Sequence, residues 1–118
     1  MINTITSYSD AEQLADFQNG VLAWADYIDL IEEGCIDKQI GKIKEEVNEY
    51  QEAIKAGDFE HAGEELADIF VTCIVSAEQN NIKLIDYLHP VIKKLISRQD
   101  TGRIIDGSFI KSEDLPNE

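Results

Sequence analysis

The chain is short, acidic and poor in the residues that interrupt helices. It has 118 residues, of which 43% are hydrophobic, with seven glycines and two prolines, so we expect a single, helix-rich domain over residues 1–118. Its 24 acidic and 10 basic side chains give a formal net charge of −14. General binding to nucleic acid is therefore not expected, because a phosphate backbone would repel such a chain.

The sequence also carries no sign of export or membrane insertion. No apolar segment approaches the roughly 20 residues that a membrane span needs, and the N-terminal segment MINTITSYSDAEQ lacks the features of a signal peptide. Cys35 and Cys73 match no metal-ligand spacing and are too few for a disulfide scaffold. We therefore expect a cytoplasmic protein with no membrane partner, and we expect Cys73, which lies in an apolar run, in the core.

Two helices are expected in the first half of the chain. The first is predicted to begin at Ser9, the start of a capping box, and to run to Gly34. Its apolar residues recur at helical spacing: Leu14, Phe17, Val21, Trp24, Ile28 and Ile31. The second is predicted to begin after a cap at Asp37 and to end at Gly57, with Asp58 as the next N-cap.

The third helix is predicted from about Phe59 to Gln79, where Asn80 and Asn81 end it. Between Leu66 and Ala77 it is apolar around nearly its whole circumference. Such a pattern is typical of a helix that is buried on all sides.

The rest of the chain is predicted to hold a fourth helix, at about residues 84–98, and a small hairpin over residues 104–110. Pro90 is expected to kink or interrupt this helix, and Asp106-Gly107 to form the turn of the hairpin. The predicted fold class is all-α, a four-helix-bundle-like domain with a short extended C-terminal tail.

Acidic residues stand at matching positions of the second and third helices. Glu46 and Glu49 on one helix, and Glu65 and Asp68 on the next, lie on either side of Gly57. Both pairs are about 9.5 residues, or roughly 14 Å, from this turn. Antiparallel neighbouring helices would therefore bring four carboxylates to one level.

The angular positions of these carboxylates differ. Glu46 is expected to flank the core, Glu49 to point outward from the same side, and Glu45 to reach solvent or a partner subunit. Asp68 shares a helix face with apolar neighbours, so we expect it to be buried. A buried carboxylate must lose its charge or find a cation. Converging carboxylates favour Mg²⁺, or alternatively Mn²⁺, and such ions bring phosphate oxygens as further ligands.

Basic residues that could face phosphates are few. Lys42 precedes the acidic residues by one turn on the side of Glu46, and Lys94 and Arg98 share a face of the fourth helix. These last two could also be present only because cations favour a helix C-terminus. A di-iron site, which needs Glu-x-x-His pairs, is not predicted, since His61 precedes the acidic residues and is expected at the surface.

These motifs resemble a known family. Gln39-x-x-Lys42-x-x-Glu45-Glu46-x-x-Glu49, followed by Glu64-Glu65-Leu66-Ala67-Asp68 at the head of an apolar helix, is similar to the MazG-like all-α nucleoside triphosphate pyrophosphohydrolases. The likeness takes in Trp24, Lys94-x-x-x-Arg98 and the segment from Gly102 to Phe109. It covers about positions 20 to 111.

The resemblance implies a reaction and roles for particular residues. Water would attack the α-phosphorus of a (d)NTP, giving (d)NMP and pyrophosphate, and Mg²⁺ would be held by Glu46, Glu49, Glu65 and Asp68. Glu45, or one of these ligands, would orient or deprotonate the water. The substrate would be bound by Lys42, Lys94 and Arg98. Trp24 or Tyr27 would stack on the base or belong to the core, and the protein would be a homodimer or homotetramer.

Three other interpretations stay open. Phosphoribosyl-ATP pyrophosphohydrolases share the acidic helices but usually carry a Tyr-His pair where this chain has Phe70-Val71. A dUTPase-like specificity is a second possibility. The third is a non-catalytic acidic helical dimer, such as a regulator or a DNA mimic, which would gain nothing from a buried carboxylate at Asp68.

Overall fold

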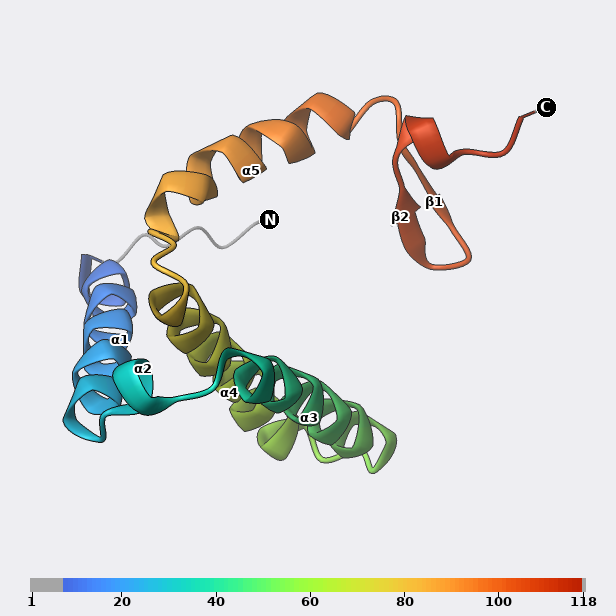
Figure 1. Ribbon diagram of the computed structural model, residues 1–118. Helices are drawn as coiled ribbons and strands as arrows, with labels where there is room; N and C mark the ends of the chain where they lie inside the picture. Colours follow the sequence, from blue (N-terminus) through green and yellow to red (C-terminus); the bar gives the residue numbers. More distant parts are fainter. Residues whose placement is uncertain (1–7, 118) are drawn as a thin grey trace. The chain divides into compact units, whose positions relative to one another are not determined.

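The structure is a computed structural model that describes residues 8–117, and it divides into two compact units, with the boundary between Ile82 and Lys83. The first unit holds four helices, shown in blue to yellow-green in Figure 1: α1 (Tyr8–Tyr27), α2 (Leu30–Glu33), α3 (Ile36–Lys55) and α4 (Phe59–Gln79). The second holds α5 (Ile85–Arg98), the strands β1 (Arg103–Ile105) and β2 (Ser108–Ile110), and the short 3₁₀ helix η1 (Ser112–Asp114). The predicted helical class is confirmed. The single bundle and the oligomeric state stay predictions.

Residues 1–7, which begin the segment in which no signal peptide was expected, lie outside the described range. Within residues 8–117, no helix combines the length and the hydropathy that crossing a bilayer requires.

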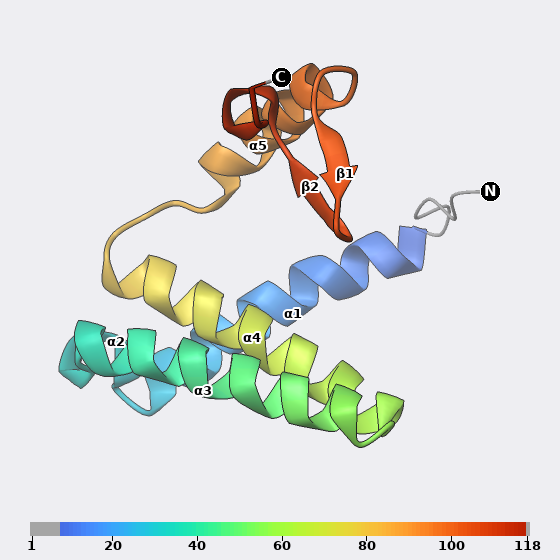
Figure 2. The same cartoon turned by 90° about the vertical axis from the view of Figure 1, so that its right-hand side faces the viewer.

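Helices α3 and α4 form the hairpin that the acidic motif requires, and they lie side by side along their length (Figure 2). The turn between them is made by Gly57, whose φ of 72° lies in the left-handed region that glycine tolerates best. Asp58 then caps α4, because its carboxylate accepts a hydrogen bond from the His61 backbone N–H at 3.1 Å. Both predicted turn residues are thus confirmed.

The core of the first unit lies between α1 and α4. Val21 and Ala25 of α1 pack against Ile74 and Val75 of α4, and Ala25 and Val75 are almost fully buried. At the margin of this core, Phe17 packs edge-on against Phe70, with ring centroids 5.4 Å apart. The apolar side of α1 therefore covers one side of α4, and α3 covers another.

The predicted first helix is wrong in one respect, because it is two helices. It ends at Tyr27, and Asp29 takes a left-handed φ of 59° before α2 begins. The Gln79 side chain donates a hydrogen bond to the Leu30 carbonyl at 3.2 Å and ties this short helix to α4. The backbone is closely packed at this point, since a Cβ at Gly34 would collide with the Leu30 carbonyl oxygen and the Gln79 side-chain nitrogen.

Other boundaries also differ from the prediction. Helix α1 is already helical at Tyr8, one residue before the predicted Ser9. Helix α3 begins at Ile36, so Asp37 lies inside its first turn and is not the N-cap. Helix α5 runs without interruption through Pro90.

The expectation that α4 is buried on all sides is wrong for this chain. Leu66 and Phe70 are about half exposed, and Cys73, which was expected in the core, is exposed as well. Helices α3 and α1 cover only part of the circumference of α4, and Leu66 and Phe70 stay about half exposed although Phe17 of α1 packs against Phe70.

The second unit contains the predicted hairpin. Strands β1 and β2 pair antiparallel, with Arg103 opposite Ile110, and the turn residues Asp106 and Gly107 both have positive φ angles, of 51° and 81°. This geometry is that of a two-residue hairpin turn of the Asp-Gly type.

Candidate functional site

Three of the four predicted ligand carboxylates meet across the α3–α4 hairpin. Glu46 and Glu49 project from α3, three residues apart and on the same side, and Glu65 projects from α4. One oxygen atom from each lies within 4.8 Å of the other two. Glu46 and Glu65 are both only 6% exposed, and Glu49 is half-buried. The predicted register about Gly57 therefore holds for these three residues.

Two of these carboxylates each have a buried oxygen atom that no donor group reaches. Within residues 8–117, Glu46 Oε2 and Glu65 Oε2 have no hydrogen-bond partner when both carboxylates are ionised. Burying charged oxygen atoms without a partner is costly. A hard divalent cation fits this set, because it takes oxygen ligands and would satisfy both atoms at once.

The electrostatics of this group are those of carboxylates that compete for one proton. The hydrogen bond with Glu46, followed by burial and the neighbouring Glu49, raises the pKa of Glu65 to about 7. Burial also acts to raise the pKa of Glu46, but hydrogen bonds from Glu65 and Lys42 outweigh it and lower that pKa. Without a cation, Glu46 is thus charged and Glu65 holds the proton at acidic pH.

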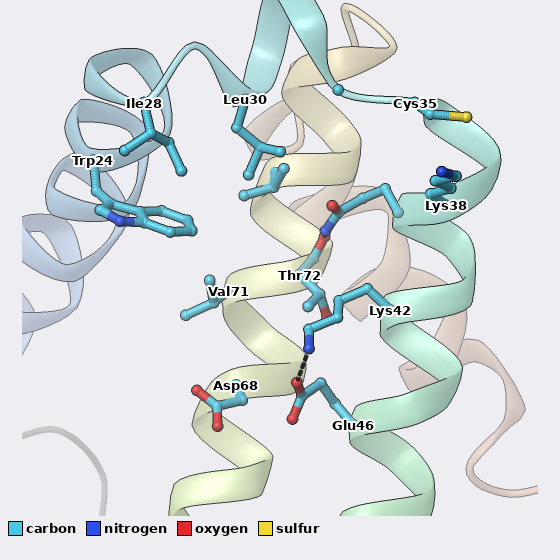
Figure 3. A pocket seen from close by; sticks show the side chains of 13 residues that line it. Trp24, Ile28, Leu30, Cys35, Lys38, Lys42, Glu46, Asp68, Val71 and Thr72 are labelled. Atoms are coloured by element: carbon cyan, nitrogen blue, oxygen red, sulfur yellow. Dashed lines mark hydrogen bonds and ion pairs between the residues drawn. The ribbon is translucent and has the colours of Figure 1, made fainter.

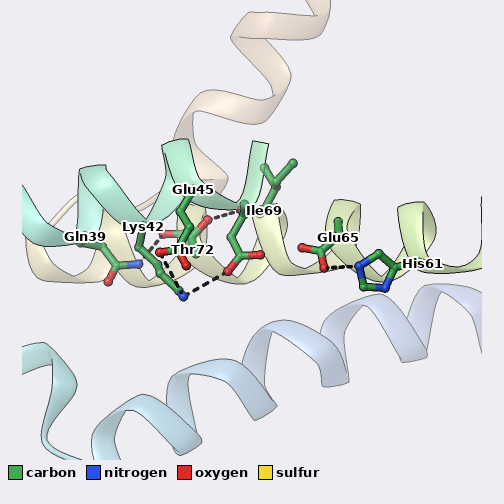
Figure 4. A network of polar contacts seen from close by, with 8 residues as sticks. Gln39, Lys42, Glu45, His61, Glu65, Ile69 and Thr72 are labelled. Atoms are coloured by element: carbon green, nitrogen blue, oxygen red, sulfur yellow. Dashed lines mark hydrogen bonds and ion pairs between the residues drawn. The ribbon is translucent and has the colours of Figure 1, made fainter. Parts of the chain in front are cut away.

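Basic side chains flank the carboxylates on both sides (Figure 4). Lys42 Nζ lies 3.3 Å from Glu46 and 3.5 Å from the exposed Glu45, and the hydrogen bond to Glu46 raises the pKa of Lys42. On α4, His61 Nε2 lies 3.2 Å from Glu65 Oε1. His61 is exposed as expected, but its contact with a predicted ligand was not foreseen, although the spacing of four residues would have indicated it.

Asp68 departs from the prediction. It was expected to be the buried carboxylate, yet its side chain is exposed, and the residue is not part of the group formed by Glu46, Glu49 and Glu65. Asp68 follows Glu65 on α4 by almost one helical turn. It lines the cavity beside the carboxylates together with Glu46.

This cavity has a volume of about 610 Å³ and is lined by residues of α1 to α4 and of the segment that joins α2 to α3 (Figure 3). One end is charged, with Lys42, Glu46 and Asp68 close together. The rest is mainly apolar, and its walls are Trp24, Ile28, Leu30, Val71 and Val75.

Trp24 and Tyr27, the two aromatic residues considered for base stacking, differ in their position relative to the cavity. Trp24 is 49% exposed and lines the cavity, so it is not a core residue. Tyr27 is 87% exposed, does not line this cavity and is not part of the core either.

The inner wall of the cavity holds two buried polar residues that the sequence did not single out as site residues. Gln39 of α3 donates from Nε2 to the backbone carbonyl of Thr72 on α4 at 3.3 Å, and the Thr72 hydroxyl donates to the Ile69 carbonyl at 2.7 Å. Two signals could have indicated the position of Gln39: it begins the motif that carries the family resemblance, and it lies one turn before Lys42 on the same side of α3.

Three further predicted site residues are Glu45, Lys94 and Arg98. Glu45 is exposed beside Lys42. Lys94 and Arg98 are on α5, in the second unit, where Arg98 lines a hollow of about 250 Å³ with Phe109 and Lys111. The roles of these three residues remain proposals.

A helical hairpin with converging buried carboxylates beside a largely apolar cavity defines a protein suited to bind a hard cation and a ligand with one charged and one apolar end. The sequence model of the MazG nucleotide pyrophosphohydrolase domain matches residues 37–102. This chain belongs to that family. The matched segment includes both acidic helices, whereas Trp24 lies outside it. No curated protein and no solved structure matches the chain.

Proposed function

We propose that the protein is a Mg²⁺-dependent hydrolase that converts a nucleoside triphosphate to its monophosphate and pyrophosphate. Its family is one of nucleotide pyrophosphohydrolases. The observation that carries the proposal for this chain is the pair of buried oxygen atoms of Glu46 and Glu65 that no donor group reaches. Glu46 also lines the charged end of the cavity.

The cation would be held by Glu46, Glu49 and Glu65, with Asp68 as a fourth ligand from the cavity side. All donors are carboxylate oxygens, which suits Mg²⁺ and, as the alternative, Mn²⁺. When bound, the ion supplies charge neutralisation at phosphate oxygens. The proton held by Glu65 would have to leave for this residue to act as a ligand.

The remaining steps fall to side chains of the protein. Glu45 is exposed next to Lys42, and we assign it the role of orienting or deprotonating the attacking water, with a ligand carboxylate as the alternative. The water oxygen bonds to the α-phosphorus while the bond from this phosphorus to the pyrophosphate oxygen breaks. Lys42 would offset the charge of the phosphates, and Lys94 and Arg98 would add to this effect.

The nucleoside would occupy the apolar part of the cavity. Trp24 offers a half-exposed ring there, suited to stacking on a base, and Lys42 lies between this region and the carboxylates (Figure 3). A homodimer or homotetramer is supported by the half-exposed apolar side chains of Leu66 and Phe70 on α4.

The test is a panel of canonical and modified (d)NTPs incubated with the protein and Mg²⁺, with products separated by chromatography. We expect monophosphate and pyrophosphate in equal amounts, no turnover in EDTA, and loss of turnover in Glu46→Gln. Release of orthophosphate, or no turnover of any nucleotide, would contradict the proposal. Including dUTP and phosphoribosyl-ATP tests the two related specificities.

A non-catalytic acidic regulator would also give no turnover. The buried carboxylate that argues against it is not Asp68, as the sequence indicated, but the pair Glu46 and Glu65. Such a module would have no use for two buried carboxylates with unsatisfied oxygen atoms.

A further inference from the structure

The two buried carboxylates have the same arrangement of neighbours. Each has a basic residue four positions earlier on its own helix, and the basic nitrogen contacts Oε1 of the carboxylate. Lys42 Nζ lies 3.3 Å from Glu46 Oε1. His61 Nε2 lies 3.2 Å from Glu65 Oε1. In both carboxylates, Oε2 is the buried oxygen atom that no donor group reaches within residues 8–117.

The two basic residues lie on opposite sides of the carboxylates along the hairpin (Figure 4). Lys42 precedes Glu46 on α3 and is farther from the hairpin turn. His61 precedes Glu65 on α4 and is nearer to the turn. Both basic side chains are about half exposed, whereas both carboxylates are almost fully buried. Each contact therefore joins a solvent-accessible base to a buried carboxylate.

The start of α4 fixes the position of His61. Its backbone N–H donates to the carboxylate of the N-cap residue Asp58 at 3.1 Å, and this hydrogen bond holds the first turn of the helix. Residues four apart on a helix lie on the same face. The cap therefore sets the place from which the imidazole reaches Glu65.

The chemistry of this contact makes His61 the donor. An ionised carboxylate only accepts hydrogen bonds, so Nε2 carries the hydrogen when Glu65 is charged. The other ring nitrogen, Nδ1, lies 3.8 Å from the exposed Glu64, which is beyond hydrogen-bond distance. His61 is not itself a member of the group whose oxygen atoms could share one ion. Its effect on a cation would therefore act through Glu65.

We infer that His61 is a positioning residue, which holds the Glu65 carboxylate in the orientation that binds the cation. The inference rests on the metal site of the proposed function and adds to it a residue outside the acidic motif. A donor at Oε1 restricts the rotation of the carboxylate and offsets its repulsion from Glu46 and Glu49. Partners of this kind behind a metal ligand typically contribute about 10–100-fold to metal affinity.

Metal affinity can be measured without turnover. The probe is Mn²⁺ alone, whose electron paramagnetic resonance signal decreases on binding, at pH 8, above the pKa of about 7 that Glu65 has in the fold. We expect His61→Leu to weaken Mn²⁺ binding by about tenfold or more. His61→Gln, which restores an N–H donor, should recover most of this loss. Because His61 is exposed, both variants should keep the helical circular dichroism of the wild type.

Turnover provides a second readout. In His61→Leu, the Mg²⁺ concentration for half-maximal activity should rise by a similar factor, while kcat at saturating Mg²⁺ stays near the wild-type value. A loss of folded protein would instead lower kcat and leave the half-saturating concentration unchanged. The two measurements together separate positioning of a ligand from a general structural role.

Two exposed residues provide controls. His89→Leu makes the same substitution at the other histidine of the chain. Glu64→Gln tests whether His61 acts through the more distant carboxylate. Both variants should bind Mn²⁺ nearly as well as the wild type, because interactions of exposed charges are weak.

The outcomes separate this inference from the proposed function. Mn²⁺ binding that is unchanged or tighter in His61→Leu would overturn the inference alone, and so would a His61→Gln variant that binds as weakly as His61→Leu. A loss in Glu64→Gln equal to that in His61→Leu would overturn it too, because His61 would then act through Glu64. A wild type that does not bind Mn²⁺, or that binds it and turns over no nucleotide, would overturn the proposed function itself.

Discussion

Glu46 and Glu65 are equally buried, yet their pKa values move in opposite directions. The asymmetry comes from their neighbours. Lys42 lies 3.3 Å from Glu46 and favours its charged form. Glu65 has no lysine or arginine within ion-pair distance among the described residues, and it faces the charge of Glu46 and Glu49. One residue of the pair therefore keeps its charge and the other keeps a proton.

This pair predicts how the metal-free protein responds to pH. The pKa of Glu65 is 4.5 as a free group and about 7 in the fold, so the folded state retains a proton that the unfolded chain has released between these values. The contribution of this proton to stability is complete below pH 4.5 and is lost as the pH rises through about 7. In EDTA, Tm should fall between pH 5 and pH 8 more steeply in the wild type than in Glu65→Gln.

Added Mg²⁺ should have different effects on the Tm of the wild type and of Glu65→Gln. We expect it to raise the Tm of the wild type, more at pH 8 than at pH 5.5 because the cation competes with the proton. It should leave Glu65→Gln nearly unchanged. Differential scanning fluorimetry with and without Mg²⁺ measures this, with the exposed Glu60→Gln as a control. Equal stabilisation of wild type and Glu65→Gln would exclude Glu65 as a ligand.

Asp68 should behave differently from Glu65, because it is exposed. We expect Asp68→Asn to change the metal-free stability by less than about 0.5 kcal/mol, as surface substitutions usually do. Activity should nevertheless fall by roughly 100-fold or more if Asp68 completes the metal site. Urea denaturation in EDTA and kcat/KM with Mg²⁺ separate the two effects. Unchanged activity would remove Asp68 from the ligand set.

At the scale of elements, the hairpin turn sets the level at which the carboxylates meet. Gly57 has a φ of 72°, whereas Gly63 lies inside α4 with no positive φ, and a Cβ would meet no neighbouring atom at either position. The backbone conformation is therefore what distinguishes the two sites, since both have room for a methyl group.

These two glycines predict opposite effects of the same substitution. Gly57→Ala should lower the free energy of unfolding by about 1 kcal/mol, because an L side chain is disfavoured in the left-handed region. Gly63→Ala should raise it by about 0.5–1 kcal/mol through higher helix propensity. Denaturant unfolding at constant pH measures both. A stabilising Gly57→Ala would show that the turn does not hold this φ in solution.

At the scale of the whole molecule, much apolar surface is uncovered in both units. Leu66 and Phe70 are exposed in the first unit, and Leu88, Ile92 and Leu95 are exposed in the second. Soluble monomers rarely expose so many large apolar side chains on neighbouring turns of a helix. Covering them requires another surface.

We therefore expect the protein to associate with itself. Light scattering after gel filtration should give a mass that is two or four times the 13.3 kDa of the chain. Leu66→Glu should shift the protein toward the monomer without loss of helical circular dichroism, because the leucine is half exposed. A monomeric wild type at micromolar concentration would contradict this expectation.

The amino-acid sequence by itself determined the local features on which the site depends. Helical periodicity and turn chemistry placed the α3–α4 turn at Gly57 and Asp58, the limits of α4 and the hairpin at Asp106. They also put Glu46, Glu49 and Glu65 at one level, because the spacing of residues along antiparallel helices is fixed by backbone geometry.

Burial was decided only by the tertiary structure. Periodicity assigns a residue to a helix face, but exposure depends on which distant segment covers that face. For this reason Glu65 is buried whereas Asp68 is exposed, and the side chains of Leu66 and Phe70 are about half exposed. The predicted first helix is likewise interrupted before α2, which the Gln79 side chain ties to α4. Likewise, the contact of Gln39 with Thr72, 33 residues away, sets the chemistry of the cavity wall, and no local pattern encodes it.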